Sequence, residues 1–391
     1  MYIGRNAEDK FLKLFDDGKV GILLGARQVG KTTLVEHVLA GRDVCFLNFD
    51  VASDRARFES ASALSPDEAL RSLGTPEFLV IDEAQRMPEV ARVVKGWHDR
   101  RLPVKILLLS SSSLDLLNQS AESLTGRNRK ITLPPLLFTE ALNTADWFDA
   151  KLDTEHLQKF FAPQIRASLL QRMCYGSYPE VVLSPNPASV LRELASDYLW
   201  KDVLQAGLVK NPDTIRRLLL LLAHQAGSEV SVNELATQLQ MVRPTVERYL
   251  DILEQTFVIF RLSAFSTNPR KEIAKSRKIF FWDTGIRNAL LNQLDPSELR
   301  PDIGSLWENW VVAEVAKKNV LNGGVADLRF WRTHAQSEVD LVVQKNGKLR
   351  GYEIKWSSRR NVSGRAFFDA YGVRVEMFTP DAALELPETD S

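Results

Sequence analysis

Eight residues near the amino end of the chain have the types and the spacing of a phosphate-binding loop. The segment Gly25–Thr32 fits the pattern G-x-x-x-x-G-K-[ST] without mismatch, after an apolar run and before a helical pattern. Glycines let backbone N–H groups curl around a phosphate, and the N-terminus of the helix adds partial positive charge. The loop and its neighbour are therefore predicted to bind ATP: Gly25, Ala26, Arg27, Gln28, Val29, Gly30, Lys31, Thr32 and Thr33.

Four side chains have the types needed to act on the bound phosphates. Lys31 would bridge the β- and γ-phosphates, and the Thr32 hydroxyl would hold Mg²⁺. A second apolar run ends in Asp82 and Glu83, where Asp82 would reach the shell of the same ion. Glu83 would polarise the attacking water as a general base. A solvated acidic turn is the alternative interpretation of these two acids.

The elements that must position these residues form an α/β pattern. Short β-rich runs alternate with helical stretches, which is typical of a parallel sheet with helices on both faces. The runs are Val20–Leu24, Val44–Phe49, Phe78–Ile81, Val104–Leu109 and Lys130–Leu133. The second run is an extra strand between the two motifs, as in NTPases with a catalytic glutamate. A chain of 391 residues also predicts two to three domains.

The N-terminal pattern resembles the prokaryotic AAA-type ATPases of the archaeal-ATPase group. The matching pieces are GARQVGKTTL, FLVIDEAQR, LLLSSSSLDLL and SLTGRNRKITLPPL. The resemblance implies a polar γ-phosphate sensor among Ser110 to Ser112, with Ser111 preferred, although a helix-capping serine is the alternative. The family often has a Thr-Gly pair where this chain has Leu109-Ser110, which leaves the sensor assignment open.

The same resemblance implies an arginine finger that reaches the nucleotide of a neighbouring subunit, and therefore a homo-oligomer. Arg127 is the preferred candidate, with Arg129 second, and such a finger contributes roughly 10³- to 10⁵-fold in rate. A surface arginine is the alternative interpretation.

The middle of the chain has the pattern of a helix-turn-helix. Ser231 begins a capping box, a short turn follows, and Pro244 opens a second helix. The segment Asn268–Phe281 could be a basic wing, with five Lys or Arg and one acid. From Lys210 to Arg287 there are twelve basic and eight acidic residues. A winged helix that contacts DNA phosphates is one interpretation, and a winged helix used only for packing is the other.

Near the carboxyl end, Asn346-Gly347 predicts a two-residue hairpin turn. If Lys345 pairs with Lys348, Asp340 lies directly opposite Glu353, with Cβ atoms about 5 Å apart. Lys355 shares their face and would stand opposite Glu338. The other face would be apolar and suited to a core: Val339, Leu341, Val343, Tyr352, Ile354 and Trp356.

Two carboxylates this close repel unless a cation joins them, and Mg²⁺ favours one or two carboxylates with waters. Lys355 could orient a nucleophilic water or stabilise developing charge. Upstream, Glu308 lies on an apolar helical stripe and points inward, where it needs a metal or a donor. The alternative is a solvated face with Glu338–Lys355 and Glu353–Lys355 ion pairs.

Glu308, Asp340, Glu353 and Lys355 together resemble the active site of the PD-(D/E)xK nuclease superfamily. The resemblance implies catalysis by Asp340, Glu353 and Lys355 and Mg²⁺ binding by Glu308, Asp340 and Glu353. Nearly the whole chain looks like a large family of prokaryotic ATPases with a nuclease-like C-terminal domain of unknown function. The predicted domains are an AAA-type ATPase (1–148), a helical lid or linker (149–207), a winged-helix-like domain (208–295) and a nuclease-like domain (296–391).

The charge composition limits which binding partners the whole molecule could attract. Fifty basic residues balance fifty acidic ones, so only a local patch could attract DNA. The two cysteines are isolated, and no signal peptide or long apolar run is present, so we expect a cytoplasmic protein without membrane segments. The leading hypothesis is an ATP-hydrolysing, DNA-associated protein with a possible Mg²⁺-dependent nuclease. An ATP-dependent scaffold with an inactive C-terminal fold, or a sequence-reading regulator, are the alternatives.

Overall fold

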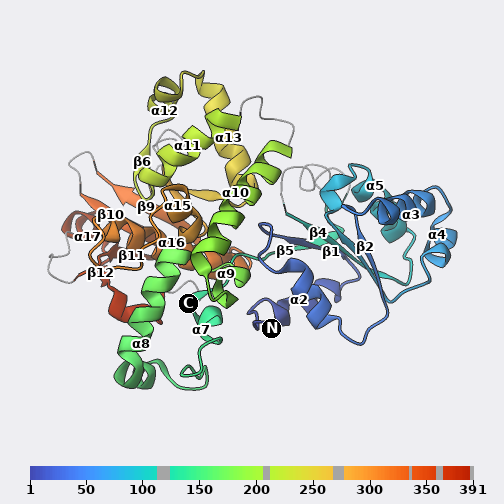
Figure 1. The fold of residues 1–391 in the computed structure, drawn as a ribbon, viewed down its shortest axis with the longest axis horizontal. Helices are drawn as coiled ribbons and strands as arrows, with labels where there is room; N and C mark the ends of the chain where they lie inside the picture. Colours follow the sequence, from blue (N-terminus) through green and yellow to red (C-terminus); the bar gives the residue numbers. More distant parts are fainter. Residues whose placement is uncertain (112–123, 206–211, 267–276, 334–336, 358–363, 388–391) are drawn as a thin grey trace. The chain divides into compact units, whose positions relative to one another are not determined.

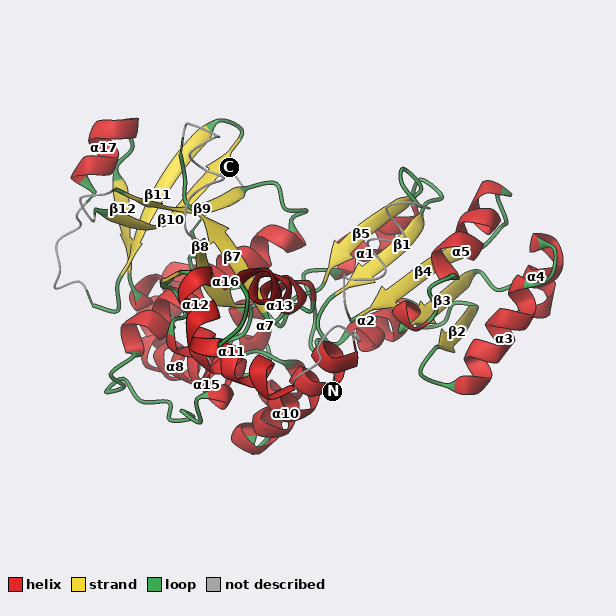
Figure 2. Cartoon of the chain, turned by 90° about the horizontal axis from the view of Figure 1, so that it is seen from above, coloured by secondary structure: helices red, strands yellow, loops and turns green. Residues whose placement is uncertain are grey.

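The chain folds into two compact units, Met1–Pro134 and Pro135–Ser391, which are described separately (Figures 1 and 2). The structure is a computed structural model that describes residues 1–111, 124–205, 212–266, 277–333, 337–357 and 364–387. None of the helices in these ranges is long and apolar enough to cross a membrane.

The first unit is built on a parallel sheet of five strands in the order β2-β3-β4-β1-β5. The strands are β1 (Val20–Leu24), β2 (Val44–Asn48), β3 (Phe78–Asp82), β4 (Lys105–Ser110) and β5 (Asn128–Thr132). The helices are α1 (Glu8–Leu12), α2 (Lys31–Val38), α3 (Ala52–Ser62), α4 (Pro66–Ser72) and α5 (Val90–Asp99), with 3₁₀ turns η1 (Lys13–Phe15) and η2 (Ala84–Arg86). The predicted parallel sheet is confirmed. In space β4 separates β1 from β3, whereas β2 lies at the edge.

The second unit combines helices with two small sheets. Its helices are α7 (Phe138–Leu142), α8 (Thr154–Tyr175), α9 (Pro179–Leu183), α10 (Pro187–Gln205), α11 (Pro212–His224), α12 (Val232–Leu239), α13 (Arg243–Gln255), α15 (Thr284–Leu290), α16 (Ile303–Leu321), α17 (Arg365–Tyr371) and the 3₁₀ turn η3 (Pro380–Ala382). One antiparallel sheet has the order β6-β8-β7, from β6 (Glu229–Val230), β7 (Ile259–Ser263) and β8 (Arg277–Phe281). The other has the order β12-β11-β10-β9, from β9 (Asp327–Arg332), β10 (Glu338–Lys345), β11 (Lys348–Ile354) and β12 (Val375–Phe378).

Helix α16 lies at the centre of the second unit. Most of its residues are buried around the whole circumference, and one apolar cluster joins it to residues from Phe138 to Ala383. A helix that is apolar on all sides is buried on all sides. The side chain of Asn309 accepts a hydrogen bond from the Phe281 N–H at 3.0 Å and donates to the Phe281 carbonyl at 2.9 Å. Asn309 thereby acts as a strand partner for β8 and fixes α16 against it. The three segments predicted as separate C-terminal domains share this core.

The hairpin of β10 and β11 has the predicted register, with Lys345 opposite Lys348 and Leu341 opposite Tyr352. A β-bulge changes the predicted faces, because the pairing of β10 with β9 shifts by one residue between Val339 and Val342. Leu341 and Val343 pack in the main core, but Val339 packs with Val342 and Phe367 in a second cluster. The prediction that Val339 shares the Leu341 face was therefore wrong. Apolar side chains cover both faces of this sheet.

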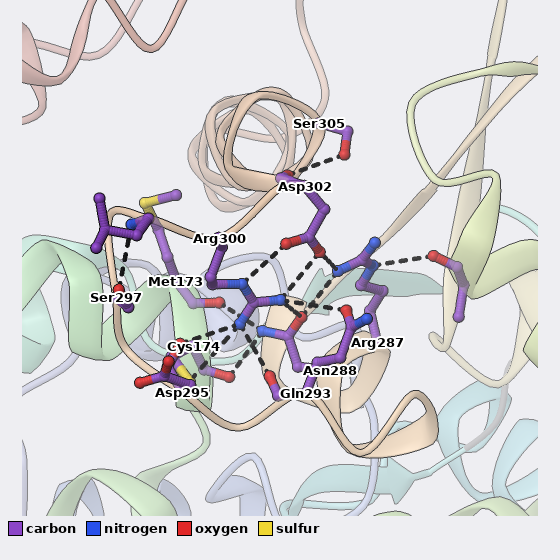
Figure 3. A network of polar contacts seen from close by, with 12 residues as sticks. Met173, Cys174, Arg287, Asn288, Gln293, Asp295, Ser297, Arg300, Asp302 and Ser305 are labelled. Carbon is purple, nitrogen blue, oxygen red and sulfur yellow. Dashed lines mark hydrogen bonds and ion pairs between the residues drawn. The ribbon is translucent and has the colours of Figure 1, made fainter.

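A buried polar network fixes the start of α16 (Figure 3). Asp302, the residue before the helix, accepts hydrogen bonds from the guanidinium groups of Arg287 and Arg300. Burial tends to raise the pKa of Asp302, but these bonds outweigh it and lower the pKa from 3.8 to about 2. Arg300 also donates to the Gln293 carbonyl at 2.8 Å and to the Asn288 side chain at 3.1 Å. The network connects α15 to the first turn of α16.

Asp302→Asn tests this network. The change leaves two buried arginines without their counter-charge, so we expect the free energy of unfolding at neutral pH to fall by roughly 3–5 kcal/mol. Because the pKa of Asp302 is lowered in the folded state, its contribution is present above pH 3.8 and is lost as pH falls through about 2. The variant and the unsubstituted protein should therefore converge in stability at low pH.

Urea denaturation at neutral pH and near pH 2 makes this comparison, with the exposed Asp381→Asn as the matched control. Equal losses for both variants at neutral pH would contradict the role of the network.

Candidate functional site

The phosphate-binding loop connects the end of β1 to the start of α2. Gly30 adopts the left-handed conformation with φ 90°, which lets the helix begin directly at Lys31. Gly25 has φ 156°, and a Cβ atom there would lie 2.2 Å from the Leu133 carbonyl oxygen. The buried ammonium of Lys31 donates to the carbonyls of Gly25 and Ala26, each at 2.8 Å. The side chains of Gln28 and Thr33, both predicted to bind ATP, are exposed.

Thr32 and Asp82 come together although they are 50 residues apart in the sequence. The Thr32 hydroxyl donates to a carboxylate oxygen of Asp82 at 2.7 Å. Carboxyl ends of parallel strands meet at one edge of the sheet, which is why the end of β3 lies beside the loop after β1. Hydroxyl and carboxylate oxygens are ligands that Mg²⁺ accepts, and the ion keeps several waters. The two side chains therefore fit a Mg²⁺ ion bound with nucleotide, and their role as its ligands stays a prediction.

Glu83 follows Asp82 in the left-handed conformation, with φ 52°. Its carboxylate accepts a hydrogen bond from the Gln85 amide at 2.5 Å and lies 3.5 Å from the Ser111 hydroxyl. Arg27 of the phosphate-binding loop approaches the same carboxylate to 3.7 Å. Ser110 and Ser111 are buried at the tip of β4, whereas the third sensor candidate, Ser112, lies outside the described residues. Both predicted motifs and the serine tip thus meet at one edge of the sheet.

Two residues of this site were missed from the sequence. Arg5 is buried and donates to the carbonyls of Val29 at 2.8 Å and Pro134 at 2.7 Å. It belongs to no motif, so no local signal identifies it. Gln85 lies three residues after Asp82, and an amide at this position was a usable signal. Arg5 contacts the phosphate-binding loop, and Gln85 contacts the Glu83 carboxylate.

Arg127 and Arg129 lie near the amino ends of the parallel strands, opposite the carboxyl ends that border the phosphate-binding loop. The pairing of Val20 with Asn128 puts Arg127 beside the start of β1, roughly 15 Å from the phosphate-binding loop. Its guanidinium donates to the Asp99 carboxylate at 2.6 Å, and Arg129 pairs with Asp17. The hydrogen bond from Arg127 lowers the pKa of Asp99. Arg127 therefore cannot act on the nucleotide of its own chain, and the arginine finger stays a prediction.

The C-terminal candidate site is held by two lysines. Lys355 lies 3.0 Å from Asp340 and 3.3 Å from Glu353, so it joins the two acids that lie next to the last pair of the hairpin, Leu341 with Tyr352. Asp340 lies within the bulge of β10, between Val339 and Val342, and its carboxylate accepts a hydrogen bond from the Ile354 N–H at 2.8 Å. Burial tends to lower the pKa of Lys355, but the two carboxylates outweigh it and raise that pKa.

The second lysine, Lys278 of β8, was not predicted to belong to this site. Its side chain is 4% exposed and lies 2.8 Å from Glu308 and 2.5 Å from Glu338. The predicted Glu338–Lys355 pair was wrong, because Glu338 turns to Lys278 instead. Burial raises the pKa of Glu308 to about 7, since the attraction of Lys278 is opposed by the negative charge of Asp340 and Glu338. Glu308, which was expected to point inward and to need a metal or a donor, accepts a hydrogen bond from Lys278.

The three predicted metal ligands do not form one ligand group. Within the described ranges, no three His, Cys, Asp or Glu side chains converge closely enough to hold a metal ion. Asp340 and Glu353 remain adjacent across the hairpin, whereas Glu308 pairs with Lys278. A Mg²⁺ ion held by one or two carboxylates and waters still fits the Asp340–Glu353 pair.

The helix-turn-helix has its predicted cap, since the Ser231 side chain accepts from the Glu234 N–H at 3.3 Å. The surface of α13 carries both signs of charge, and Arg243 pairs with Glu247 at 2.9 Å. Most of the predicted basic wing, including Arg270, Lys271 and Lys275, lies outside the described residues. A DNA contact here stays a prediction.

One family model supports the AAA-type assignment of the first unit. Residues 17–142 match a family described as an AAA domain. Residues 166–297 and 303–377 match two families described as domains of unknown function, DUF8612 and DUF4143. Among solved structures, the Walker-type ATPase PABY2304 of Pyrococcus abyssi is 16% identical, with a TM-score of 0.46, over 74% of this chain and 96% of that chain.

Two curated relatives extend along most of the chain. The uncharacterized protein Rv2008c of Mycobacterium tuberculosis is 30% identical over 92% of this chain and 75% of its own length. The uncharacterized protein MJ1544 of Methanocaldococcus jannaschii is 24% identical over 87% of this chain and 75% of its own length. The chain belongs to the same family as the mycobacterial protein, and its first unit is an AAA-type P-loop ATPase domain.

Proposed function

We propose that this protein hydrolyses ATP at the edge of the first sheet, and that its second unit carries a Mg²⁺-dependent site for phosphodiester cleavage in DNA. The observation that carries the first part is the convergence of Lys31, the Thr32–Asp82 pair and Glu83 at one edge. A bound Mg²⁺ ion would supply Lewis-acid charge at the phosphates. The other contributions belong to the chain.

Each residue of the ATP site has one expected task. Lys31 leaves the two loop carbonyls and donates to the β- and γ-phosphates. The Thr32 hydroxyl and the Asp82 carboxylate supply oxygen ligands beside each other. Glu83 accepts a proton from the attacking water. Together these tasks amount to positioning and charge stabilisation, which is how proteins catalyse phosphoryl transfer.

Glu83→Gln and Lys31→Ala separate hydrolysis from binding. Glu83→Gln removes the base but no phosphate contact, so kcat should fall by roughly 10²- to 10⁴-fold while the Kd for ATP stays near that of the unsubstituted protein. Lys31→Ala removes a charge-assisted contact to the phosphates, so the Kd should rise roughly 10- to 100-fold. Phosphate release and the binding of a fluorescent ATP analogue measure the two quantities.

The exposed Glu59→Gln on α3 is the matched control for the glutamate change. Hydrolysis that survives in Glu83→Gln would contradict the assignment of the base. No hydrolysis by the unsubstituted protein would contradict the function.

The second part of the proposal rests on Asp340, Glu353 and Lys355. The bulge places the Asp340 carboxylate beside the Ile354 N–H and Lys355, so two acids and a lysine converge at one place on the hairpin. Bulges often lie next to active sites because they redirect a side chain. Asp340 and Glu353 would bind the Mg²⁺ ion, and Lys355 would orient the attacking water. In this proposal Lys278 forms ion pairs with Glu308 and Glu338 and thereby fixes α16 against β8.

Glu353→Gln tests the C-terminal site. If the site cleaves DNA, the loss of one carboxylate should reduce cleavage roughly 100-fold or more, while ATP hydrolysis in the first unit is kept. The assay uses supercoiled and branched DNA with Mg²⁺ or Mn²⁺, with and without ATP. The exposed Glu376→Gln on β12 of the same sheet is the matched control.

An ATP-dependent scaffold is the second candidate for this unit. The observation that favours it is that Lys278 and Lys355 already supply the positive charge beside all four acids. No cleavage by the unsubstituted protein with either metal, together with DNA or protein binding that Glu353→Gln leaves intact, would support this candidate. A homo-oligomer with Arg127 acting on the neighbouring nucleotide is part of both proposals.

A further inference from the structure

Gln85 connects the general base of the ATP site to the tip of a different strand. Its amide nitrogen donates to the Glu83 carboxylate at 2.5 Å and lies 3.0 Å from the Ser111 hydroxyl. Its amide oxygen accepts a hydrogen bond from the Ser110 hydroxyl at 2.7 Å. Gln85 belongs to the 3₁₀ turn η2 after β3, whereas both serines belong to the end of β4 or follow it directly. One side chain therefore spans the two strand ends that border the predicted reaction centre.

The chemistry of the neighbours fixes the orientation of this amide. A carboxylate can only accept hydrogen bonds when ionised, so the NH₂ group must face Glu83 and the carbonyl must face Ser110. A reversed amide would place its oxygen 2.5 Å from a carboxylate oxygen, where two partial negative charges repel. The Ser110 hydroxyl can rotate to donate to the carbonyl. The orientation is thus determined by a charge on one side and a donor on the other.

Glu83 needs such a support because its own backbone does not hold the side chain in place. It lies in the left-handed conformation at the start of the turn η2, and its side chain makes no capping hydrogen bond to that turn. The other groups near this carboxylate lie farther away, with Arg27 at 3.7 Å and Ser111 at 3.5 Å. The Gln85 amide is the nearest donor among the contacts described for it. A misplacement of about 1 Å at a reacting group can cost roughly 10²-fold in rate.

We propose that Gln85 is a positioning residue for ATP hydrolysis: it holds the Glu83 carboxylate in register with the tip of β4. This inference rests on the proposed ATPase function and adds to it a residue that acts through Glu83. Gln85 touches neither phosphates nor water in this role. Its removal should lower kcat and leave both the Kd for ATP and the fold unchanged.

Gln85→Glu and Gln85→Ala distinguish positioning from simple packing. Gln85→Glu keeps the size and the acceptor for Ser110, but it replaces the donor that faces Glu83 with a second carboxylate. Positioning predicts that kcat falls roughly 10- to 100-fold in both variants, with Gln85→Glu at least as impaired as Gln85→Ala. Packing or the Ser110 contact alone predicts that Gln85→Glu keeps nearly full activity.

The split between kcat and the Kd for ATP adds a readout that a structural role would not move. Positioning predicts that kcat falls in both variants while the Kd for ATP and the unfolding temperature stay near those of the unsubstituted protein. Gln164→Glu, the same change on the exposed surface of α8, should leave all three quantities unchanged.

The measurements are steady-state phosphate release, binding of a fluorescent ATP analogue and thermal unfolding for every variant. If Gln85→Ala fails to fold, Gln85→Glu decides the question, because it conserves shape. Activity of Gln85→Glu within twofold of the unsubstituted protein, or a change in KM alone, would overturn the inference. Absence of hydrolysis in the unsubstituted protein would instead overturn the proposed function, and the inference with it.

Discussion

Charge buried in an apolar surrounding must be matched, and the second unit depends on this constraint. Helix α16 is enclosed by apolar side chains, yet it carries or adjoins several charged groups. Each of them has a partner of opposite sign: Glu314 has Lys317 at 2.8 Å, Glu308 has Lys278, and Asp302 has Arg287 and Arg300. An unmatched charge at any of these places would cost several kcal/mol. The partners come from three different elements, so the pairing also determines how α15, β8 and α16 fit together.

The same constraint links the fold to the candidate C-terminal site. Three acids of the hairpin and Glu308 of α16 repel each other, and the two lysines Lys278 and Lys355 offset this repulsion. Lys278 comes from the sheet of β6, β7 and β8, whereas Lys355 follows β11 in the other sheet. The acid site is therefore not a property of the last hundred residues alone. Its acids lie on or beside the hairpin and on α16, and one of its two lysines, Lys278, comes from the other sheet.

Features that depend on residues close together in the sequence could be predicted from the sequence alone. The phosphate-binding loop, the acidic end of β3, the Ser231 cap and the hairpin register each depend on residues within about ten positions of each other, and all four were predicted. Long-range contacts outside a known pair of motifs were not predicted: Lys278 reaches Glu308 across 30 residues, and Arg5 reaches Pro134 across 129. The bulge in β10 was not predicted either, because the prediction of the two faces assumed that side chains alternate strictly along a regularly paired strand. Val339 and Glu338 were consequently assigned to the wrong neighbours.

The exit of β5 has a mechanical consequence. The Leu133 carbonyl borders the first glycine of the phosphate-binding loop, and Arg5 clamps that loop to the Pro134 carbonyl. Pro135 follows at once, so the chain leaves the ATPase domain through two prolines whose φ angles are fixed near −65°. The backbone beside the loop therefore has fewer accessible conformations than an ordinary linker would have. The last residues of the first unit therefore form a rigid border of the phosphate-binding loop.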